Sequence, residues 1–262
     1  MKPTGFLALL MPICAFAQLA PPNPAGVSFG HVHFITQDME AHRRFWTMLG
    51  ATAGRAAGPN EVFRLQGALI LLRKQESNGG SAESIVNHIG FRIHDLDAVL
   101  AECRKAGIEI LTPDSFAKNR KGNVMGPDRV IVELMADPSL TVPVAFHHVH
   151  FLNSPVEDTR AWYVKNFGAV AGVRDKTIQM ADVPGANLSF GASKTTPAPT
   201  KGRVFDHIGF EVKNLEEFCK KLEAAGVKFD QRYTKGPNAR VAIAYIFDPW
   251  GTYIELTEGL GQ

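Results

Sequence analysis

The most restrictive feature of this sequence is an internal repeat: three short segments bearing histidine or glutamate occur twice, in the same order and at nearly constant separation. The paired segments are Gly-His31-Val-His33-Phe with His-His148-Val-His150-Phe, Asn-His88-Ile-Gly-Phe with Asp-His207-Ile-Gly-Phe, and Val-Ile-Val-Glu133-Leu with Thr-Tyr-Ile-Glu255-Leu. Such a repeat indicates a duplicated domain. We place the boundary in the short Pro-bearing segment 137–143, which predicts domains over 25–138 and 144–260.

Each predicted domain consists of two similar halves. His31 and His88 open alternating apolar strands that lead into an amphipathic helix and then a Gly, and His148 and His207 do the same in the second copy. The predicted helices cover residues 39–49, 96–106, 160–167 and 215–225, and short strands follow each of them. We therefore predict an α+β protein of four βαβββ modules that form curved mixed sheets.

The N-terminus has the pattern of a secretory signal peptide. Lys2 precedes an apolar stretch over 5–16 that is too short to span a bilayer, and Ala15-Phe16-Ala17 has the small-x-small form of a cleavage site. The alternative is a buried N-terminal helix, which the Pro-rich segment 19–24 disfavours. We expect residues 1–17 to be removed and the mature protein to be periplasmic or secreted.

Composition and charge restrict the partners. The chain is 45% hydrophobic and 21% charged, as is typical of globular proteins, and its net charge of +2 is too small to favour a nucleic acid or an anionic membrane. We expect a small-molecule substrate and a monomer or homodimer. Cys103 and Cys219 lie among apolar residues on different predicted helices, so we expect both to be buried and unpaired.

The repeated histidines and glutamates have the residue types of a metal site. Two His at strand starts and a Glu within a third strand converge only if a curved sheet brings the three side chains to one face. Two neutral imidazoles and a carboxylate can then hold a divalent ion and leave adjacent positions open for a substrate that binds through two oxygens. The alternative is a metal-free scaffold in which an Arg neutralises each Glu. The cost of burying these polar groups unpaired favours the metal.

This ordered set of motifs resembles the vicinal oxygen chelate superfamily, which includes glyoxalase I, extradiol ring-cleaving dioxygenases, methylmalonyl-CoA epimerase, fosfomycin-resistance enzymes and the metal-free bleomycin-resistance proteins. The resemblance covers about residues 27–260 and implies two tandem domains of this type. It implies metal ligands His31, His88 and Glu133 in the first domain and His148, His207 and Glu255 in the second. His33 and His150 lie two residues further along the same strands and point the same way, which makes them candidates for substrate contact.

Two assemblies of these ligands remain open. The halves of one domain can form a site, or halves can be exchanged between domains. Exchange would pair His31 with His207 and Glu255, and His148 with His88 and Glu133. The other histidines are expected outside the site: His147 faces the opposite side of its strand, and His42 and His94 are expected at the surface.

The segment from Tyr245 to Glu255 is similar to the extradiol dioxygenase signature, in which the Tyr hydrogen-bonds a catechol oxygen and the Glu is a metal ligand. Asp248-Pro-Trp-Gly251 within it is also ordinary turn chemistry. Two histidines expected in relatives of this type are missing, because Asn238 occupies one position and residues 188–205 contain none. The first domain lacks the corresponding turn, so if only one domain is active we expect it to be the second.

We therefore predict an enzyme that holds Fe²⁺ or Mn²⁺, with Zn²⁺ or Ni²⁺ as alternatives, and carries out an extradiol-dioxygenase-like reaction on a substrate chelated through adjacent oxygens. His148, His207 and Glu255 would hold the ion in the second domain, Tyr245 would orient a substrate oxygen and His150 would relay a proton. A glyoxalase- or epimerase-like lyase or isomerase is the alternative enzyme, although residues 68–72 and 186–190 offer no extra Glu or Gln ligand. The non-catalytic alternative is a small-molecule binding protein of the bleomycin-resistance type. We expect two ions per chain.

Overall fold

The computed structural model describes residues 19–153, 155–237 and 239–261. The predicted signal peptide, residues 1–17, and Asn238 lie outside the described residues. Among the helices that the structure describes, none has the length and apolar character needed to cross a membrane.

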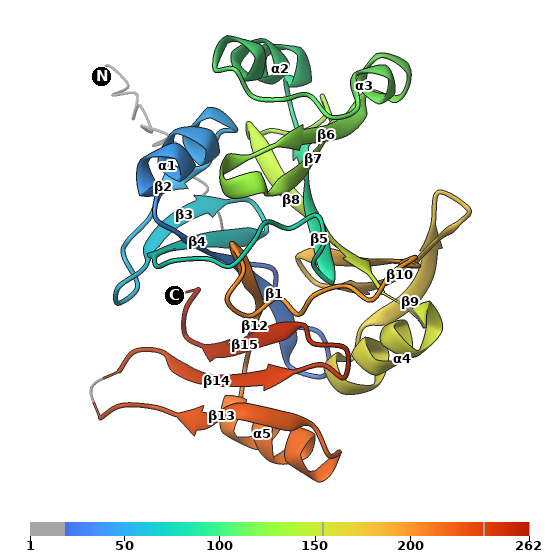
Figure 1. The fold of residues 1–262 in the computed structure, drawn as a ribbon. Coiled ribbons are helices and arrows are strands. Elements are labelled where there is room, and N and C mark those ends of the chain that lie inside the picture. The colour runs from blue at the N-terminus through green and yellow to red at the C-terminus, as the bar shows by residue number, and fades with distance from the viewer. Residues whose placement is uncertain (1–18, 154, 238, 262) are drawn as a thin grey trace, which may run out of the picture.

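Four modules follow one another along the chain (Figure 1). The first comprises β1 (Val27–Thr36), α1 (Met39–Met48), β2 (Thr52–Ala53), β3 (Glu61–Leu65) and β4 (Ala68–Lys74). The second comprises β5 (Val86–Ile93), α2 (Leu96–Lys105), α3 (Pro113–Asn119), β6 (Lys121–Met125), the 3-10 turn η1 (Pro127–Arg129) and β7 (Ile131–Ala136). The third comprises β8 (Val144–Leu152), α4 (Val156–Phe167), β9 (Val170–Arg174), β10 (Ile178–Val183) and β11 (Ala186–Gly191). The fourth comprises β12 (Phe205–Val212), α5 (Leu215–Ala224), β13 (Lys228–Thr234), β14 (Ala242–Phe247) and β15 (Tyr253–Glu258).

The predicted α+β fold of four modules is confirmed, and the four predicted helices are α1, α2, α4 and α5. The side chains of Asp38 and Asp95 cap α1 and α2 by accepting hydrogen bonds from the first-turn amides. The second module departs from the pattern. There, α3 and an isolated bridge between Ile110 and Val124 take the place of the first strand after the helix.

The modules combine into two sheets, and each sheet draws strands from both halves of the chain. The eight-stranded sheet has the order β13-β14-β15-β12-β1-β4-β3-β2, and the seven-stranded sheet has the order β6-β7-β5-β8-β11-β10-β9. The first module therefore joins the fourth through antiparallel β1 and β12, and the second joins the third through antiparallel β5 and β8. In Figure 1, blue β1 accordingly lies beside orange β12.

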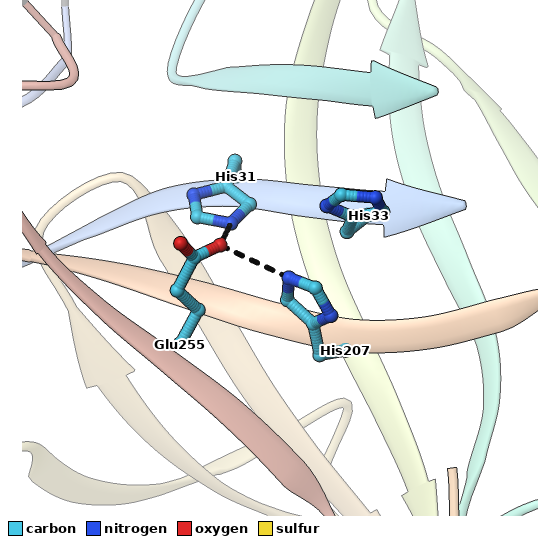
Figure 2. A group of neighbouring side chains, drawn as sticks. All are labelled: His31, His33, His207 and Glu255. Atoms are coloured by element: carbon cyan, nitrogen blue, oxygen red, sulfur yellow. Dashed lines mark hydrogen bonds and ion pairs between the residues drawn. The ribbon is translucent and has the colours of Figure 1, made fainter. Parts of the chain in front are cut away.

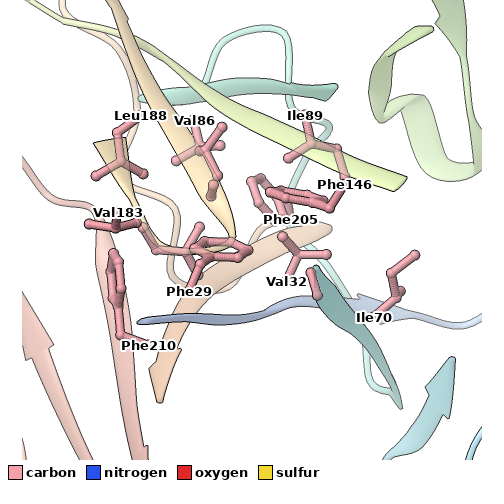
Figure 3. Close-up of a cluster of buried hydrophobic side chains, with 14 of the residues drawn as sticks. Phe29, Val32, Ile70, Val86, Ile89, Phe146, Val183, Leu188, Phe205 and Phe210 are labelled. Atoms are coloured by element: carbon pink, nitrogen blue, oxygen red, sulfur yellow. The ribbon is translucent and has the colours of Figure 1, made fainter. Parts of the chain in front are cut away.

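The hydrophobic core lies between the two sheets and beneath their helices. Alternate residues of β1, such as Val32 and Phe34, enter this core, and the rings of Phe29 and Phe146 stack at 4.8 Å between the sheets (Figure 3). A β-bulge separates Phe29 from His31, because these two residues pair with the consecutive residues Phe210 and Gly209 of β12. The bulge turns His31 away from the core, onto the opposite face of the sheet.

Predictions about four side chains can be checked against burial. Cys103 and Cys219 are buried and free, and His94 is exposed, as expected. The prediction that His42 lies at the surface is wrong, because its side chain is fully buried. His42 shares the buried stripe of α1 with Phe45 and Trp46, and its Nε2 lies 3.2 Å from a carboxylate oxygen of Asp128 in η1.

Candidate metal centres

The first cluster of candidate ligands, site 1, consists of His31 and His33 of β1, His207 of β12 and Glu255 of β15 (Figure 2). Their candidate ligand atoms all lie within 4.8 Å of one another, and all four side chains are buried. Glu255 Oε2 lies 2.9 Å from His31 Nε2 and 3.0 Å from His207 Nε2. Both imidazoles thus converge on one carboxylate oxygen.

The spacing of these atoms fits a divalent ion. Two atoms that are each about 2.1 Å from an ion and occupy neighbouring octahedral positions are about 3 Å apart. The two nitrogen-to-oxygen distances of site 1 match this separation. His33 lies further along β1, with its ring centroid 4.3 Å from that of His207, so it borders the same space.

The charges around His207 also favour a cation. His207 Nδ1 lies 2.6 Å from Asp206 Oδ1, while its Nε2 faces Glu255. Burial alone would lower the pKa of His207, but the hydrogen bonds and negative charges of Asp206 and Glu255 raise this pKa to about 9. In the absence of an ion, a proton on His207 compensates the two carboxylates. A carboxylate behind a metal-binding imidazole is also the usual means of orienting it.

Aromatic side chains border site 1 on the side of β14 and β15. The ring of Tyr245 lies 5.6 Å from that of His207 and stacks on Tyr253 at 5.2 Å. Burial and the neighbouring Glu255 carboxylate raise the pKa of Tyr245, so its hydroxyl stays protonated and able to donate a hydrogen bond. Tyr245 is therefore placed as the resemblance implied, beside the candidate ligands.

The second cluster, site 2, consists of His88 of β5, Glu133 of β7, and His148 and His150 of β8. Glu133 Oε2 lies 3.1 Å from His148 Nε2 and 3.6 Å from His88 Nε2. The ring of His150 stacks on that of His88 at 4.4 Å. Burial lowers the pKa values of His148 and His150 to about 3, so both imidazoles are neutral at neutral pH.

The residues that contact the histidines of site 2 differ from those around site 1. His88 Nδ1 lies 2.9 Å from Asn87 Oδ1, so an amide stands where site 1 has the carboxylate of Asp206. His147 Nδ1 lies 2.8 Å from His148 Nδ1. The expectation that His147 simply faces away from the site is wrong, because a β-bulge between Phe146 and His148 places it against a candidate ligand.

The glycine of each His-Ile-Gly-Phe motif explains how the clusters are assembled. Gly209 is the strand partner of His31, and Gly90 is the strand partner of His148. A Cβ at Gly209 would overlap the His31 ring, and a Cβ at Gly90 would overlap the His148 ring. Each glycine thus leaves space for an imidazole from the other half of the chain.

The structure selects the exchanged assembly of the two that the sequence left open. The predicted single-domain set of His148, His207 and Glu255 is wrong, because β8 pairs with β5 and places His148 in the other sheet. For the same reason His150 borders site 2 while Tyr245 borders site 1, so the two cannot act on one substrate as predicted. All six predicted ligands nevertheless belong to one cluster or the other.

Sequence reasoning missed Asp206 and Tyr253. Asp206 directly precedes His207 and is replaced by Asn87 in the other copy of the motif, so the difference between the repeats was a usable signal. Tyr253 lies two residues before Glu255, and the alternation of β15 places both side chains on one face.

Comparison with known proteins identifies the family. The family model of the Glyoxalase/Bleomycin resistance protein/Dioxygenase superfamily matches residues 28–134 and 145–256. The chain belongs to this superfamily. The resemblance to vicinal oxygen chelate proteins is thereby confirmed, including the tandem arrangement. No curated protein sequence matches this superfamily member.

Solved structures of the superfamily share the fold over most of the chain. Glyoxalase I from Zea mays is 15% identical, with a TM-score of 0.70 over 90% of this chain and 93% of that chain. A putative dioxygenase from Bacillus subtilis is 11% identical, with a TM-score of 0.65 over 93% of this chain and 87% of that chain. At these identities the likeness establishes the fold and leaves the reaction to be argued from the site.

Proposed function

We propose that this superfamily member is a divalent-metal-dependent enzyme that binds a small substrate through two adjacent oxygens at site 1, and that its reaction is of the extradiol dioxygenase type. The observation that carries the proposal is the convergence of His31 Nε2 and His207 Nε2 on one oxygen of Glu255. Two histidines and one carboxylate with open positions form the set typical of non-haem Fe²⁺ oxygenases.

Each residue of site 1 has a separate role in this proposal. His31, His207 and Glu255 would hold the ion, which when bound supplies Lewis-acid and redox chemistry. Asp206 orients His207 through Nδ1. Tyr245 donates a hydrogen bond to a substrate oxygen. His33 is neutral, because burial and the neighbouring His207 lower its pKa well below the usual value, so it can accept a proton from a substrate hydroxyl.

A lyase or isomerase of the glyoxalase type is the second candidate, and one observation favours it. His33 lies within ligand distance of the other three groups, so site 1 offers a fourth protein ligand that leaves fewer positions open. If His33 does not bind the ion, its neutral imidazole would instead serve as the base that moves a proton between substrate carbons.

Metal analysis and oxygen uptake separate these candidates. We expect purified protein to hold iron or manganese, and the reconstituted protein to consume oxygen with catechols. His207→Ala should remove the site 1 ion and this activity, whereas the matched variant His88→Ala in site 2 should leave both. Bound zinc or nickel with proton exchange and no oxygen uptake would favour the lyase or isomerase. A protein that takes up no metal would be a small-molecule binding protein, and the enzyme proposal would be wrong.

We also propose that the protein is exported as a monomer or homodimer. The basis is the pattern Lys2, apolar 5–16 and Ala15-Phe16-Ala17. N-terminal sequencing of the protein recovered from its native cells should find Gln18 as the first residue in the periplasmic or secreted fraction. Recovery of an uncleaved chain from the cytoplasm would refute export.

A further inference from the structure

A cavity of about 420 Å³ lies on the ligand-bearing side of the eight-stranded sheet. Its lining combines three arginines with apolar side chains, namely Arg55, Arg64, Arg240, Val62, Leu69 and Leu260. Val62 and Leu69 belong to a small hydrophobic cluster separate from the main core. The cavity thus occupies the face that carries site 1 and not the face packed against the other sheet.

None of the candidate ligands lines this cavity itself, but strand register connects its lining to site 1. Leu69 of β4 is the partner of His31 on one side and of Arg64 on the other. Directly paired residues point to the same face of a sheet, and neighbouring strands are about 4.8 Å apart. Arg64 therefore stands in the same row as His31, two strands or roughly 10 Å away. A planar ring with one substituent can bridge that distance.

The arginines of the cavity have no carboxylate partner among the described residues. Within the part of the chain that the structure describes, no carboxylate forms an ion pair or hydrogen bond with Arg55, Arg64 or Arg240. Arg64 is half-buried, and it packs against Gly54, where an added Cβ would lie 3.1 Å from its Cγ and Nε. A guanidinium without a carboxylate partner among the described residues keeps its donors available for an anionic ligand.

The equivalent row through site 2 ends in a negatively charged residue where the row through site 1 ends in a positively charged one. A row here is the set of residues paired directly across neighbouring strands. The row through site 1 contains Tyr245, Glu255, Gly209, His31, Leu69 and Arg64. The row through site 2 contains, in the same order, Asn123, Glu133, Gly90, His148, Asn187 and Asp182. The position of Arg64 is thus taken by Asp182, which accepts a hydrogen bond from Asn187 at 2.7 Å. The two copies of the repeat therefore share the candidate ligands but differ in charge at this end of the row.

We propose that the substrate of site 1 carries an anionic substituent, a carboxylate or phosphate, which Arg64 binds together with Arg55 and Arg240 while the adjacent oxygens face His31, His207 and Glu255. This assignment rests on the proposed function and adds the substrate class. Arginine matches both anions through paired N–H donors, so the shared chemistry is a planar or tetrahedral oxyanion. Site 2, with Asp182 at the same position, repels such a group.

The test compares probes that share a catechol but differ in charge. Catechol, 3,4-dihydroxybenzoate and 3,4-dihydroxyphenylphosphonate are titrated into the Fe²⁺-loaded protein without oxygen, and dissociation constants are measured by calorimetry. We expect an anionic probe to bind about tenfold more tightly than catechol, and Arg64→Gln to reduce this ratio about tenfold. Because the ratio is compared between proteins, intrinsic differences in chelation cancel. The control variant Arg44→Gln, an exposed arginine of α1 outside the cavity, should leave the ratio unchanged.

The possible outcomes test the anionic substrate and the proposed function separately. Tighter binding of either anionic probe, lost in Arg64→Gln, supports it, and the order of the two probes shows which anion the cavity prefers. If Arg64→Gln does not fold, the exposed pair Arg55→Gln and Arg240→Gln provides the same test. Equal binding of neutral and anionic probes, or a preference that survives these variants, overturns the anionic substrate alone. Failure of all three probes to bind the loaded protein overturns the proposed function as well.

Discussion

His207 has two carboxylate neighbours, and their charges determine whether its imidazole is protonated before a metal binds. In the metal-free protein its two ring nitrogens face Asp206 and Glu255, and its pKa is raised to about 9. At pH 7 the imidazole is therefore protonated, although a metal ligand must be neutral. In site 2 the imidazoles of His148 and His150 have pKa values of about 3 and carry no such proton.

We therefore predict that metal binding to site 1 at pH 7 displaces the His207 proton, so it releases a larger number of protons than binding to site 2 and strengthens as the pH rises toward 9. Calorimetric titrations in buffers of different ionisation enthalpy measure this number. His88→Ala isolates site 1 and His207→Ala isolates site 2. Equal proton release from the two variants would contradict the assigned charge states.

A second prediction for a single residue concerns Gly209. A Cβ at this position would overlap the His31 ring, which must then move away from Glu255. We expect Gly209→Ala to lose the site 1 ion and to keep the site 2 ion, at a stability cost of about 1–3 kcal/mol from overpacking. Metal stoichiometry and chemical denaturation measure the two effects.

The control for this prediction is its equivalent in the other sheet. Gly90→Ala should lose the site 2 ion and keep the site 1 ion, because the added Cβ would overlap the His148 ring. If either variant kept two ions, the close approach of glycine and imidazole would not be what assembles the clusters.

Among the secondary-structure elements, the turn between β14 and β15 connects Tyr245 to Glu255. Asp248 Oδ1 accepts hydrogen bonds from the amides of Trp250, Gly251 and Thr252, at 3.0, 2.8 and 2.7 Å. Asp248 Oδ2 accepts one at 3.0 Å from the hydroxyl of Tyr163, which is fully buried on α4. The Asp-Pro-Trp-Gly sequence thus forms the expected turn and also fastens it to a helix of the third module.

Asp248→Ala should lower the free energy of unfolding by about 2 kcal/mol or more, because it leaves the buried Tyr163 hydroxyl and the turn amides without their acceptor. Tyr163→Phe should cost less, about 1 kcal/mol, since it removes one donor and keeps the turn. Urea denaturation of the two variants tests the order. A larger loss for Tyr163→Phe than for Asp248→Ala would show that the turn contributes little.

The elements that sequence patterns predicted are those with a regular apolar period. The stripe of α5, with buried Leu215, Phe218, Cys219 and Leu222, is an example. The helix α3 was not predicted because it has seven residues and only Phe116 is buried, which is too short to show a period. His42 lies on the buried stripe of α1, but the sequence showed no partner pattern for it, which predicted the surface. Its partner Asp128 is 86 residues away along the chain and is brought beside it only by the tertiary structure.

For the molecule as a whole, the exchange of modules makes each site depend on both halves of the chain. Because β1 pairs with β12, His31 and His207 belong to site 1, while His88 belongs to site 2. We predict that the double variant His31→Ala/His207→Ala keeps one ion per chain and that His31→Ala/His88→Ala keeps none. Elemental analysis gives the stoichiometry. One ion retained by the second double variant would mean that the sites form within single domains.

The sequence by itself determined the repeat and the order of strands and helices, because strand alternation and motif order depend on local pattern alone. Its resemblance to the vicinal oxygen chelate superfamily implied the fold family and the six side chains that converge in two clusters. Which cluster each side chain joins was decided only by the tertiary structure. Both assemblies use identical spacings along the chain, so no local pattern distinguishes them. The choice follows from the pairing of β1 with β12 and of β5 with β8, where the sheets bury their apolar faces against each other and a glycine on each partner strand makes room for an imidazole.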